Sequence, residues 1–201
     1  TMELYTDGSL DIFAHETNVD TQNRITSHDI HALSEDLKQP GFVTITDAML
    51  NRVNHNWAQG RKTHVFIDEF HIAYENEYSG NFFTSAWRQF RKRNAAPCAI
   101  TQNVEYLLDS IQASTILSNS EFIVMLNQAE SDQERLSRLL NISPEQMSYV
   151  NGAEAGCGLM RYGNALVPFV NRFPADTELY KLITTKPGEG MFSKGQVDFN
   201  A

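Results

Sequence analysis

The chain has little of what marks a membrane protein, a disulfide framework or a broadly nucleic-acid-binding protein. No apolar run approaches the ~20 residues that a membrane-spanning helix needs. The only two cysteines, Cys98 and Cys157, are isolated, which predicts two reduced, buried thiols. Lys and Arg number 16 against 25 Asp and Glu, and the net charge of −9 argues against a broad phosphate-binding surface. A length of 201 residues is sufficient for a sizeable core.

Two short apolar segments end in polar residues that suit phosphate chemistry. The run 64–69 stops at two adjacent carboxylates, Asp68 and Glu69, and the run 97–102 ends at Gln102. If these are neighbouring parallel strands, their ends meet at the carboxyl edge of the sheet, where ligands bind. In phosphate-hydrolysing proteins the first carboxylate holds Mg²⁺ through water, and the second orients the attacking water. A solvated strand end is the simpler alternative, but the second polar strand end favours a nucleoside-triphosphatase core.

The Gly-rich phosphate loop G-x-x-x-x-G-K-[ST] is missing. The nearest similar stretch, 60–63, lacks the earlier glycine, has Arg where Lys belongs, and leads into a strand instead of a helix. We therefore expect the chain to be part of a larger ATPase, downstream of its phosphate loop, and to be inactive alone.

Strands and helices alternate along the chain, which predicts an α/β fold with a RecA-like, mostly parallel sheet flanked by helices. A further strand is predicted over 121–126, and the segments 158–162 and 165–170 predict an antiparallel hairpin at one edge. We expect a partial ATPase domain over residues 1–186 and a flexible tail over residues 187–201.

Helix signals are found at several further positions. Hydrophobic periodicity predicts helices over 33–57 and 104–117, with Pro40 breaking or kinking the first of them. Ser131 and Ser143 are each followed three residues later by Glu or Gln, which predicts a helix start at each.

A basic segment ends the helix that we predict over 81–94, whose aromatic face we expect to be core. Arg88, Arg91 and Arg93 either form an ordinary helix end, since cations favour the last turn, or include an arginine finger. Arg91 and Arg93 are better placed for that role than Arg88, because they come just before the strand that ends at Gln102.

The histidines do not predict a direct metal site. His28 and His31 have no partner at ligand spacing, and on a strand they would point to opposite faces. His71, two residues after Glu69, is better explained as a hinge or as support for a neighbouring group than as a base.

Taken together, these segments resemble a known family. It is similar to the carboxyl-terminal part of the ATPase domain of conjugation and type IV secretion ATPases of the TraC/TraE type, which belong to the HerA–FtsK group of RecA-like motors. The resemblance runs from about residue 23 to residue 189. The matching pieces are Val65–His71, Phe90–Asn94, Ala99–Asn103, Ser118–Phe122, Ala155–Leu159 and Val167–Phe169.

The resemblance implies a role for each candidate residue. Asp68 would coordinate Mg²⁺ through water, Glu69 would be the general base, and Gln102 would sense the γ-phosphate of ATP. Arg91 or Arg93 would act on a neighbouring subunit. ATP and Mg²⁺ would be the cofactors of the intact parent protein, with none bound to this chain.

The resemblance also implies partners and a location. The parent would form a homo-oligomer, a hexamer, and work with other subunits of the secretion or conjugation machinery, with a possible DNA contact. It would lie in the cytoplasm, peripherally at the cytoplasmic face of the membrane, and power pilus assembly or the transfer of DNA or protein.

Two other functions remain open. Asp68-Glu69-Phe70-His71 also suits a fragment of a DExH-type helicase, although Thr101-Gln102 fits the secretion motors better. A non-catalytic assembly module that has lost its phosphate loop is the alternative from a different class.

Overall fold

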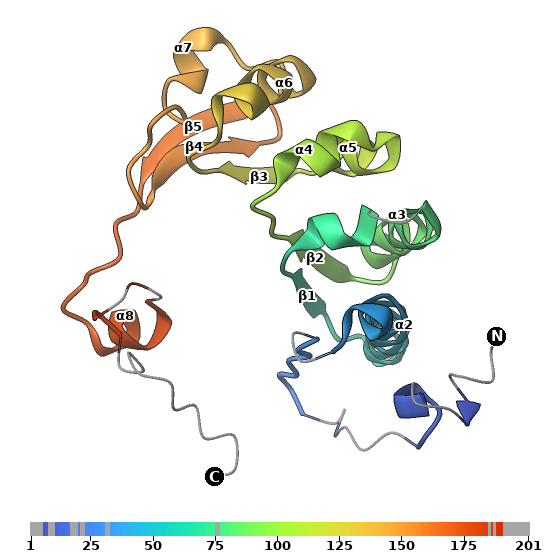
Figure 1. Ribbon diagram of the computed structural model, residues 1–201. Coiled ribbons are helices and arrows are strands. Elements are labelled where there is room, and N and C mark those ends of the chain that lie inside the picture. Colours follow the sequence, from blue (N-terminus) through green and yellow to red (C-terminus); the bar gives the residue numbers. More distant parts are fainter. Residues whose placement is uncertain are drawn as a thin grey trace. The chain divides into compact units, whose positions relative to one another are not determined.

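The computed structural model describes residues 6–7, 11–16, 20, 23–30, 33–74, 77–184, 186 and 188–190 (Figure 1). The chain divides into two compact units, Thr1–Ile116 and Leu117–Ala201. The single ATPase domain expected over residues 1–186 stays a prediction. The expected tail lies outside the described residues except for 188–190.

The two units hold different sets of elements. The first contains η1 Asp11–Phe13, α2 Glu35–Ala58, β1 Thr63–Ile67, η2 Phe70–Tyr74, α3 Glu77–Lys92, β2 Ala95–Ala99, α4 Val104–Asp109 and most of α5 Ile111–Ser118. The second contains β3 Phe122–Met125, α6 Glu130–Leu140, α7 Pro144–Met147, β4 Cys157–Tyr162, β5 Ala165–Val170 and α8 Glu178–Ile183. None of the helices described is both long enough and apolar enough to cross a membrane.

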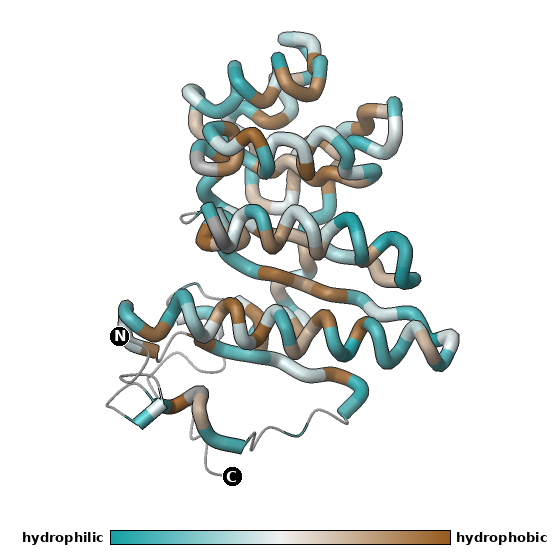
Figure 2. Tube along the Cα trace, turned by 90° about the vertical axis from the view of Figure 1, so that its right-hand side faces the viewer, coloured by the Kyte–Doolittle hydropathy of each residue, from teal (hydrophilic) through white to brown (hydrophobic). Residues whose placement is uncertain are grey.

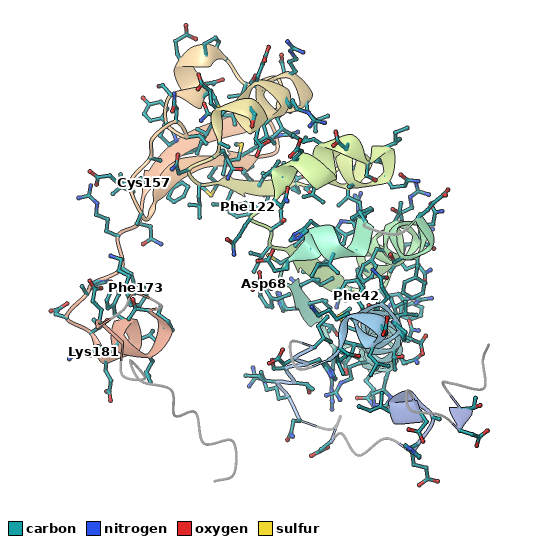
Figure 3. All side chains as sticks on the ribbon, viewed as in Figure 1. Phe42, Asp68, Phe122, Cys157, Phe173 and Lys181 are labelled. Carbon is teal, nitrogen blue, oxygen red and sulfur yellow. The ribbon has the colours of Figure 1, made fainter. Side chains whose placement is uncertain are left out.

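Aromatic side chains build the core of the first unit. Phe83 and Phe90 of α3 are fully buried, which confirms that the aromatic face of this helix is core. Phe83 stacks on Phe42 of α2 at 4.8 Å between ring centroids and meets Phe70 edge-on at 5.9 Å (Figure 3 labels Phe42). Each such ring contributes about 1.5–3 kcal/mol through burial. Figure 2 shows hydrophobic and hydrophilic segments alternating along the helices, which is typical of helices that bury one face.

The strands β1 and β2 pair in parallel, as the sequence predicts. Their register runs from Thr63 opposite Ala95 to Ile67 opposite Ala99. Parallel pairing places both carboxyl ends at one edge of the sheet and both amino ends at the other. This two-edged arrangement determines where every candidate functional residue of the first unit lies.

The second unit contains a separate antiparallel sheet in the order β3-β4-β5. The hairpin of β4 and β5 is confirmed, and it turns at Gly163, whose φ of 55° suits glycine. The strands form two sheets, the parallel pair β1-β2 and an antiparallel sheet of three in which β3 pairs with β4. The α/β class and the parallel pair at the predicted position are confirmed. The side chains of β3 are all apolar, so their pattern does not distinguish a parallel partner from an antiparallel one.

The helix predictions are correct in part. Pro40 lies inside α2 without ending it, and its carbonyl accepts a hydrogen bond from the Thr44 hydroxyl at 2.8 Å. The predicted single helix over 104–117 is divided at Ser110, which has extended backbone angles. The start predicted at Ser131 is wrong, because α6 begins at Glu130 after Ala129.

The capping box at Ser143 is confirmed. Its hydroxyl accepts a hydrogen bond from the backbone N–H of Gln146 at 3.3 Å, and the Gln146 side chain accepts one from the N–H of Ser143 at 3.0 Å. Both contacts satisfy backbone donors that would otherwise be unpaired at a helix start.

The two cysteines are free thiols, but they are less buried than the sequence predicts. Cys98 is exposed and Cys157 is half-buried. Cys98 lies near the end of β2, where the residues change from half-buried to exposed. A strand in a two-stranded sheet has fewer neighbours than one in a wide sheet, so its apolar residues do not all become core.

Candidate active site

The ends of β1 and β2 are joined by backbone hydrogen bonds that continue beyond the strands. The N–H of Ile100 donates to the carbonyl of Ile67 at 2.8 Å, and the N–H of Phe70 donates to the carbonyl of Ile100 at 2.9 Å. These bonds hold the segments 68–71 and 100–103 side by side. The predicted meeting of the two polar strand ends at one edge is therefore confirmed.

Glu69 adopts a backbone conformation that is unusual for a residue with a side chain. Its φ is 48°, in the left-handed region, which costs about 1–3 kcal/mol for a residue other than glycine. Its N–H donates to Oδ1 of Asp68 at 2.9 Å, and this bond stabilises the turn locally. The turn sends the chain from the strand into η2 while keeping both carboxylates at the sheet edge (Figure 3 labels Asp68).

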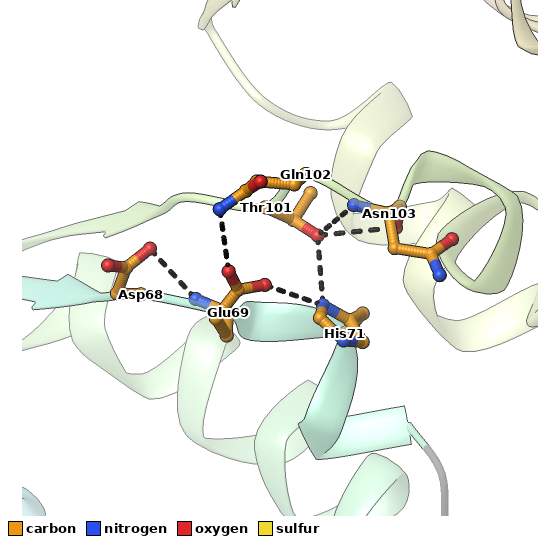
Figure 4. A network of polar contacts seen from close by, with 6 residues as sticks. All are labelled: Asp68, Glu69, His71, Thr101, Gln102 and Asn103. Carbon is orange, nitrogen blue, oxygen red and sulfur yellow. Dashed lines mark hydrogen bonds and ion pairs between the residues drawn. The ribbon is translucent and has the colours of Figure 1, made fainter. Parts of the chain in front are cut away.

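Two side chains hold the Glu69 carboxylate, one on each oxygen (Figure 4). Nε2 of Gln102 donates to Oε1 at 2.9 Å, and Nδ1 of His71 lies 3.2 Å from Oε2. The Glu69 side chain stays 38% exposed, whereas His71 is only 18% exposed. The carboxylate is thus fixed in orientation and still open to solvent, and lone pairs remain on both oxygens for a water.

The contacts with Thr101 and Glu69 favour one tautomer of His71. The Thr101 hydroxyl donates to the carbonyl of Asn103 and accepts from the N–H of Asn103, both at 3.2 Å. With the Thr101 proton assigned to Asn103, the tautomer of His71 that suits both the hydroxyl oxygen and the Glu69 carboxylate, each 3.2 Å from Nδ1, carries its proton on Nδ1. An Nδ1–H group also makes the contact with the Glu69 carboxylate favourable. His71 therefore supports the neighbouring Glu69, one of the two roles that the sequence suggests for it.

The donor set fits a water-mediated magnesium site only in part. Asp68 is an exposed carboxylate beside Glu69, and Mg²⁺ commonly takes one or two carboxylates, several waters and the phosphates of its substrate. In the part of the chain that the structure describes, no group of three or more His, Cys, Asp or Glu residues could hold a metal ion. Asp68 and Glu69 therefore suit the coordination of Mg²⁺, but the groups that would bind the phosphates are not among the residues of this site.

The basic segment lies at the opposite edge of the sheet. The last turn of α3 carries Arg91, and Arg93 follows just before β2 begins at Ala95, so both are near the amino end of that strand. Five strand residues at ~3.3 Å each separate this edge from the Gln102 edge by roughly 16 Å. The structure therefore brings Asp68, Glu69 and Gln102 together and does not bring Arg91 or Arg93 to them.

The stretch 60–63 also lies at the amino edge, because its last residue, Thr63, is the first residue of β1. It cannot cradle a phosphate beside Glu69, which agrees with its rejection as a phosphate loop on sequence grounds.

Sequence reasoning missed Thr101 and Asn103 as parts of the network. A Thr placed two residues before an Asn that precedes a helix is a signal for a local side-chain turn. That signal was available in Thr101-Gln102-Asn103.

No protein-family profile matches the chain, and no curated protein matches it. Eight chains of solved structures do. Among them is VirB4 of Thermoanaerobacter pseudethanolicus, to which this chain is similar with a TM-score of 0.74 and 19% sequence identity over 87% of its length. The chain spans 49% of that VirB4 chain, about half its length. The comparison shows that the chain has the fold of a part of VirB4.

Proposed function

We propose that the chain is part of a type IV secretion ATPase and that its first unit supplies the groups that activate water for ATP hydrolysis. The observation that carries this proposal is the 2.9 Å hydrogen bond between Gln102 and Glu69 at the carboxyl edge of two parallel strands. The fold shared with part of VirB4, a type IV secretion ATPase, supports the choice of family.

In this proposal each residue of the edge has one task. The Glu69 carboxylate accepts the proton of the attacking water, and Gln102 senses the γ-phosphate. Asp68 would hold Mg²⁺ through water, and the ion bound with ATP would supply positive charge against the phosphates. The phosphate loop comes from a part of the ATPase outside this sequence.

His71 has a positioning role in the same proposal. Its Nδ1–H group fixes one oxygen of Glu69, so the other can face the water in a constant orientation. A general base needs correct geometry before its pKa matters. The link from His71 to Thr101 connects this orientation to the segment that carries Gln102.

Arg91 or Arg93 acts as a finger on a neighbouring subunit of a hexamer. Their position at the amino edge, away from Glu69 of the same chain, supports action between subunits and not within one. A guanidinium at the γ-phosphate stabilises charge in the transition state.

The work that ATP hydrolysis performs belongs to the same proposal. The ATPase acts with other subunits of a secretion machinery at the cytoplasmic face of the membrane, and it drives pilus assembly or the transfer of DNA or protein. The likeness to VirB4 supports this general kind of partner.

Glu69→Gln in the full-length protein tests the proposal. The amide keeps the shape of the carboxylate but cannot accept the water's proton, so we expect kcat to fall by about 10²- to 10⁴-fold with ATP affinity nearly unchanged. Glu105→Gln, at an exposed carboxylate in the first turn of α4, is the matched control and should retain full turnover. If Glu69→Gln hydrolyses ATP at the rate of the control, the site is wrong and a non-catalytic assembly module becomes the better explanation.

The 201-residue chain by itself should show negligible ATP hydrolysis and weak nucleotide affinity. Backbone nests and a phosphate-loop lysine normally hold the phosphates, and its sequence contains no such loop. Phosphate release and calorimetry on the purified chain measure both quantities. Rapid turnover by the chain alone would reveal a phosphate site that its sequence does not show.

The role of His71 is tested by substitution and by its tautomer. We expect His71→Ala to lower kcat of the full-length protein with little change in ATP affinity, and His71→Asn, whose amide can replace the Nδ1 donor, to restore part of it. In the isolated chain, nitrogen NMR of the ring should show a proton on Nδ1. A ring protonated only on Nε2 would contradict the proposed support of Glu69.

The arginine finger is tested by mixing subunits. Replacing the arginine that acts as the finger, by Arg91→Ala or by Arg93→Ala, should lower turnover by a factor on the order of 10³. Mixing the arginine variant with Glu69→Gln subunits should restore activity at interfaces that combine an intact Glu69 with an intact arginine. No recovery in any mixture would leave the arginines as an ordinary helix end or a contact surface.

A further inference from the structure

Charge is distributed very unevenly along the first unit. Two segments, 48–67 and 78–104, contain seven of the 16 Lys and Arg residues and none of the 25 Asp and Glu residues. The protein as a whole is acidic, with a net charge of −9. These two segments therefore hold the largest local excess of positive charge in the first unit.

The fold brings the ends of both segments to one edge. The turn after α2 leads into the amino end of β1, the turn after α3 leads into the amino end of β2, and Thr63 pairs with Ala95. The N–H of Thr63 donates to the carbonyl of Asn94 at 3.3 Å, which joins the two turns directly. The cations that this places together are Arg61, Lys62, Arg91, Lys92 and Arg93.

The turn after α2 is held in a fixed shape. Gly60 has a φ of 71°, and its N–H donates to the carbonyl of Trp57 at 2.9 Å. The N–H of Arg61 donates to the carbonyl of Asn56 at 2.8 Å, which completes a Schellman motif. Nδ2 of Asn56 donates to the Thr63 hydroxyl at 2.9 Å and ties the turn to β1. Arg61 and Lys62 therefore project from a preorganised turn.

These cations are not neutralised within the described part of the chain. Four of the five are exposed, Arg93 is half-buried, and none takes part in an ion pair of the described residues. Two helix C-termini at the same edge contribute about −0.5 charge each, which is the ordinary reason for cations in a last turn. About one negative charge against five positive ones leaves about four in excess, so the helix dipoles do not account for the cluster.

An exposed aromatic ring lies at the same edge. Trp57 is in the last turn of α2 and is 52% exposed, although α2 also offers a buried face on which a large ring could pack. Cations that contact phosphates together with an aromatic face on which a base can stack are typical of proteins that bind single-stranded nucleic acid. A membrane surface or an acidic protein would use the cations but would not need the stacking face.

We propose that Trp57, Arg61, Lys62 and Arg91–Arg93, here called the basic edge, form a binding surface for single-stranded nucleic acid. The cations contact successive phosphates, and the indole of Trp57 stacks on a base. The surface lies at the opposite edge of the sheet from Glu69 and Gln102 of the same chain. It is complete in the isolated chain, whereas in the assembled ATPase the arginine that acts as the finger is engaged at the neighbouring subunit's γ-phosphate. Binding at the basic edge needs no ATP.

Titration of the purified chain with a fluorescently labelled oligothymidylate tests this proposal. The slope of log K against log salt should be about −3.5 if five cations contact phosphates, at ~0.7 per contact for single strands. Arg61→Gln/Lys62→Gln should reduce that slope to about −2.1. Trp57→Ala should weaken binding on the order of ten-fold, and oligothymidylate should quench the Trp57 fluorescence of the wild type.

The matched control is Arg138→Gln/Arg172→Gln, which removes the same charge from exposed arginines that pair with Glu134 and Glu154. It should bind as the wild type does. The proposal is overturned if both double variants lose the same affinity, if duplex DNA binds as tightly as the single strand, or if only vesicles of anionic lipid bind. Circular dichroism of each variant checks that the fold is intact, and neither pair includes a residue of the proposed active site.

Discussion

Gly158 in β4 lies where the neighbouring strand leaves no room for a side chain. A Cβ atom there would stand 2.2 Å from the carbonyl oxygen of Met125 and 3.2 Å from the Phe169 ring. Backbone atoms of β3 cannot move aside without breaking the pairing of the sheet. Gly152, by contrast, has a φ of 66° but nothing within 4 Å of the position of a Cβ.

We therefore expect Gly158→Ala to lower the free energy of unfolding by about 3 kcal/mol, since overpacking displaces backbone. Gly152→Ala should cost only about 1 kcal/mol, because its left-handed conformation alone is unfavourable for alanine. Urea denaturation followed by far-UV circular dichroism measures both. Equal losses for the two variants would mean that β3 and β4 adjust easily.

Tyr74 carries a buried hydroxyl without a hydrogen bond in the described part of the chain. Burial raises the pKa of this phenol above 10.0, and the nearby Thr84 hydroxyl opposes the shift to a smaller extent. The Thr84 proton itself goes to the carbonyl of Gly80 at 2.8 Å, so it does not satisfy the phenol oxygen. An unpaired buried hydroxyl costs free energy that a phenylalanine would not.

Tyr74→Phe should leave the free energy of unfolding at pH 7 unchanged or raise it by up to about 1 kcal/mol. The unfolded phenol ionises near 10.0 and the folded one at higher pH, so the wild type loses stability as pH rises through that range. The variant should lose less over the same range. Denaturation curves at neutral and alkaline pH measure the loss of stability in each protein. The control is Tyr162→Phe, because Tyr162 is 61% exposed. A marked loss of stability in Tyr74→Phe at pH 7 would show that the hydroxyl is satisfied after all.

The candidate site was predictable at the residue level only where it depends on strand ends. Asp68, Glu69 and Gln102 meet because parallel neighbours end at one edge, which the sequence pattern indicates. The contacts of His71 and Thr101 depend on the positive φ of Glu69 and on the turn into η2. The sequence does not indicate that Glu69 adopts a left-handed conformation, so the contacts of His71 and Thr101 could not be predicted from it.

At the scale of elements, α2 contains a proline that its other contacts tolerate. Pro40 cannot donate the backbone hydrogen bond that its position in the helix would supply, and its ring crowds the preceding turn. Phe42 and Val53 of the same helix are buried, and their packing favours a continuous helix. Local propensity predicts a break or a kink at Pro40, and tertiary burial keeps the helix continuous through it.

We expect Pro40→Ala to raise the free energy of unfolding by up to about 3 kcal/mol, because it restores a hydrogen bond and removes the crowding. Pro144→Ala is the matched contrast, since Pro144 occupies the first turn of α7, where proline is favourable. It should give no gain. Trp fluorescence in urea reports the first substitution, because Trp57 lies in α2. No gain from Pro40→Ala would mean that the helix is already relaxed around the ring.

The predicted helix boundaries are wrong where a side-chain hydrogen bond, and not hydrophobic spacing, determines where a helix begins or ends. Ser110 separates α4 from α5 and accepts a hydrogen bond from the N–H of Ala113 at 3.2 Å, while the apolar spacing runs on through it. Ser143 was identified because both halves of its capping box are used. Ser131 has the same spacing, but the helix had already begun at Glu130.

At the scale of the whole molecule, the net charge gives the average for the chain and does not reveal a local cluster of cations. A net charge of −9 indicates a poor partner for phosphates, and it remains a correct statement about most of the chain. The basic edge exists because the parallel pairing of β1 and β2 joins two turns that are about thirty residues apart in sequence. Charge along the sequence therefore predicts a binding surface only after the topology is known.

The two units should unfold separately, because each has its own buried core. Both tryptophans, Trp57 and Trp87, belong to the first unit, so tryptophan fluorescence reports that unit alone. Far-UV circular dichroism reports both units. We expect the two probes to give transitions in urea that do not coincide, with two steps in the dichroism curve.

The substitution Gly158→Ala shows which step of the dichroism curve belongs to which unit. It changes a strand of the second unit, so it should move the dichroism step that fluorescence does not follow and leave the fluorescence midpoint unchanged. Pro40→Ala should do the reverse. Coincident curves for the wild type, or a fluorescence midpoint that moves with Gly158→Ala, would show that the units unfold as one cooperative body. In that case a ligand bound at the basic edge should raise the stability of both units, and otherwise it should raise that of the first unit alone.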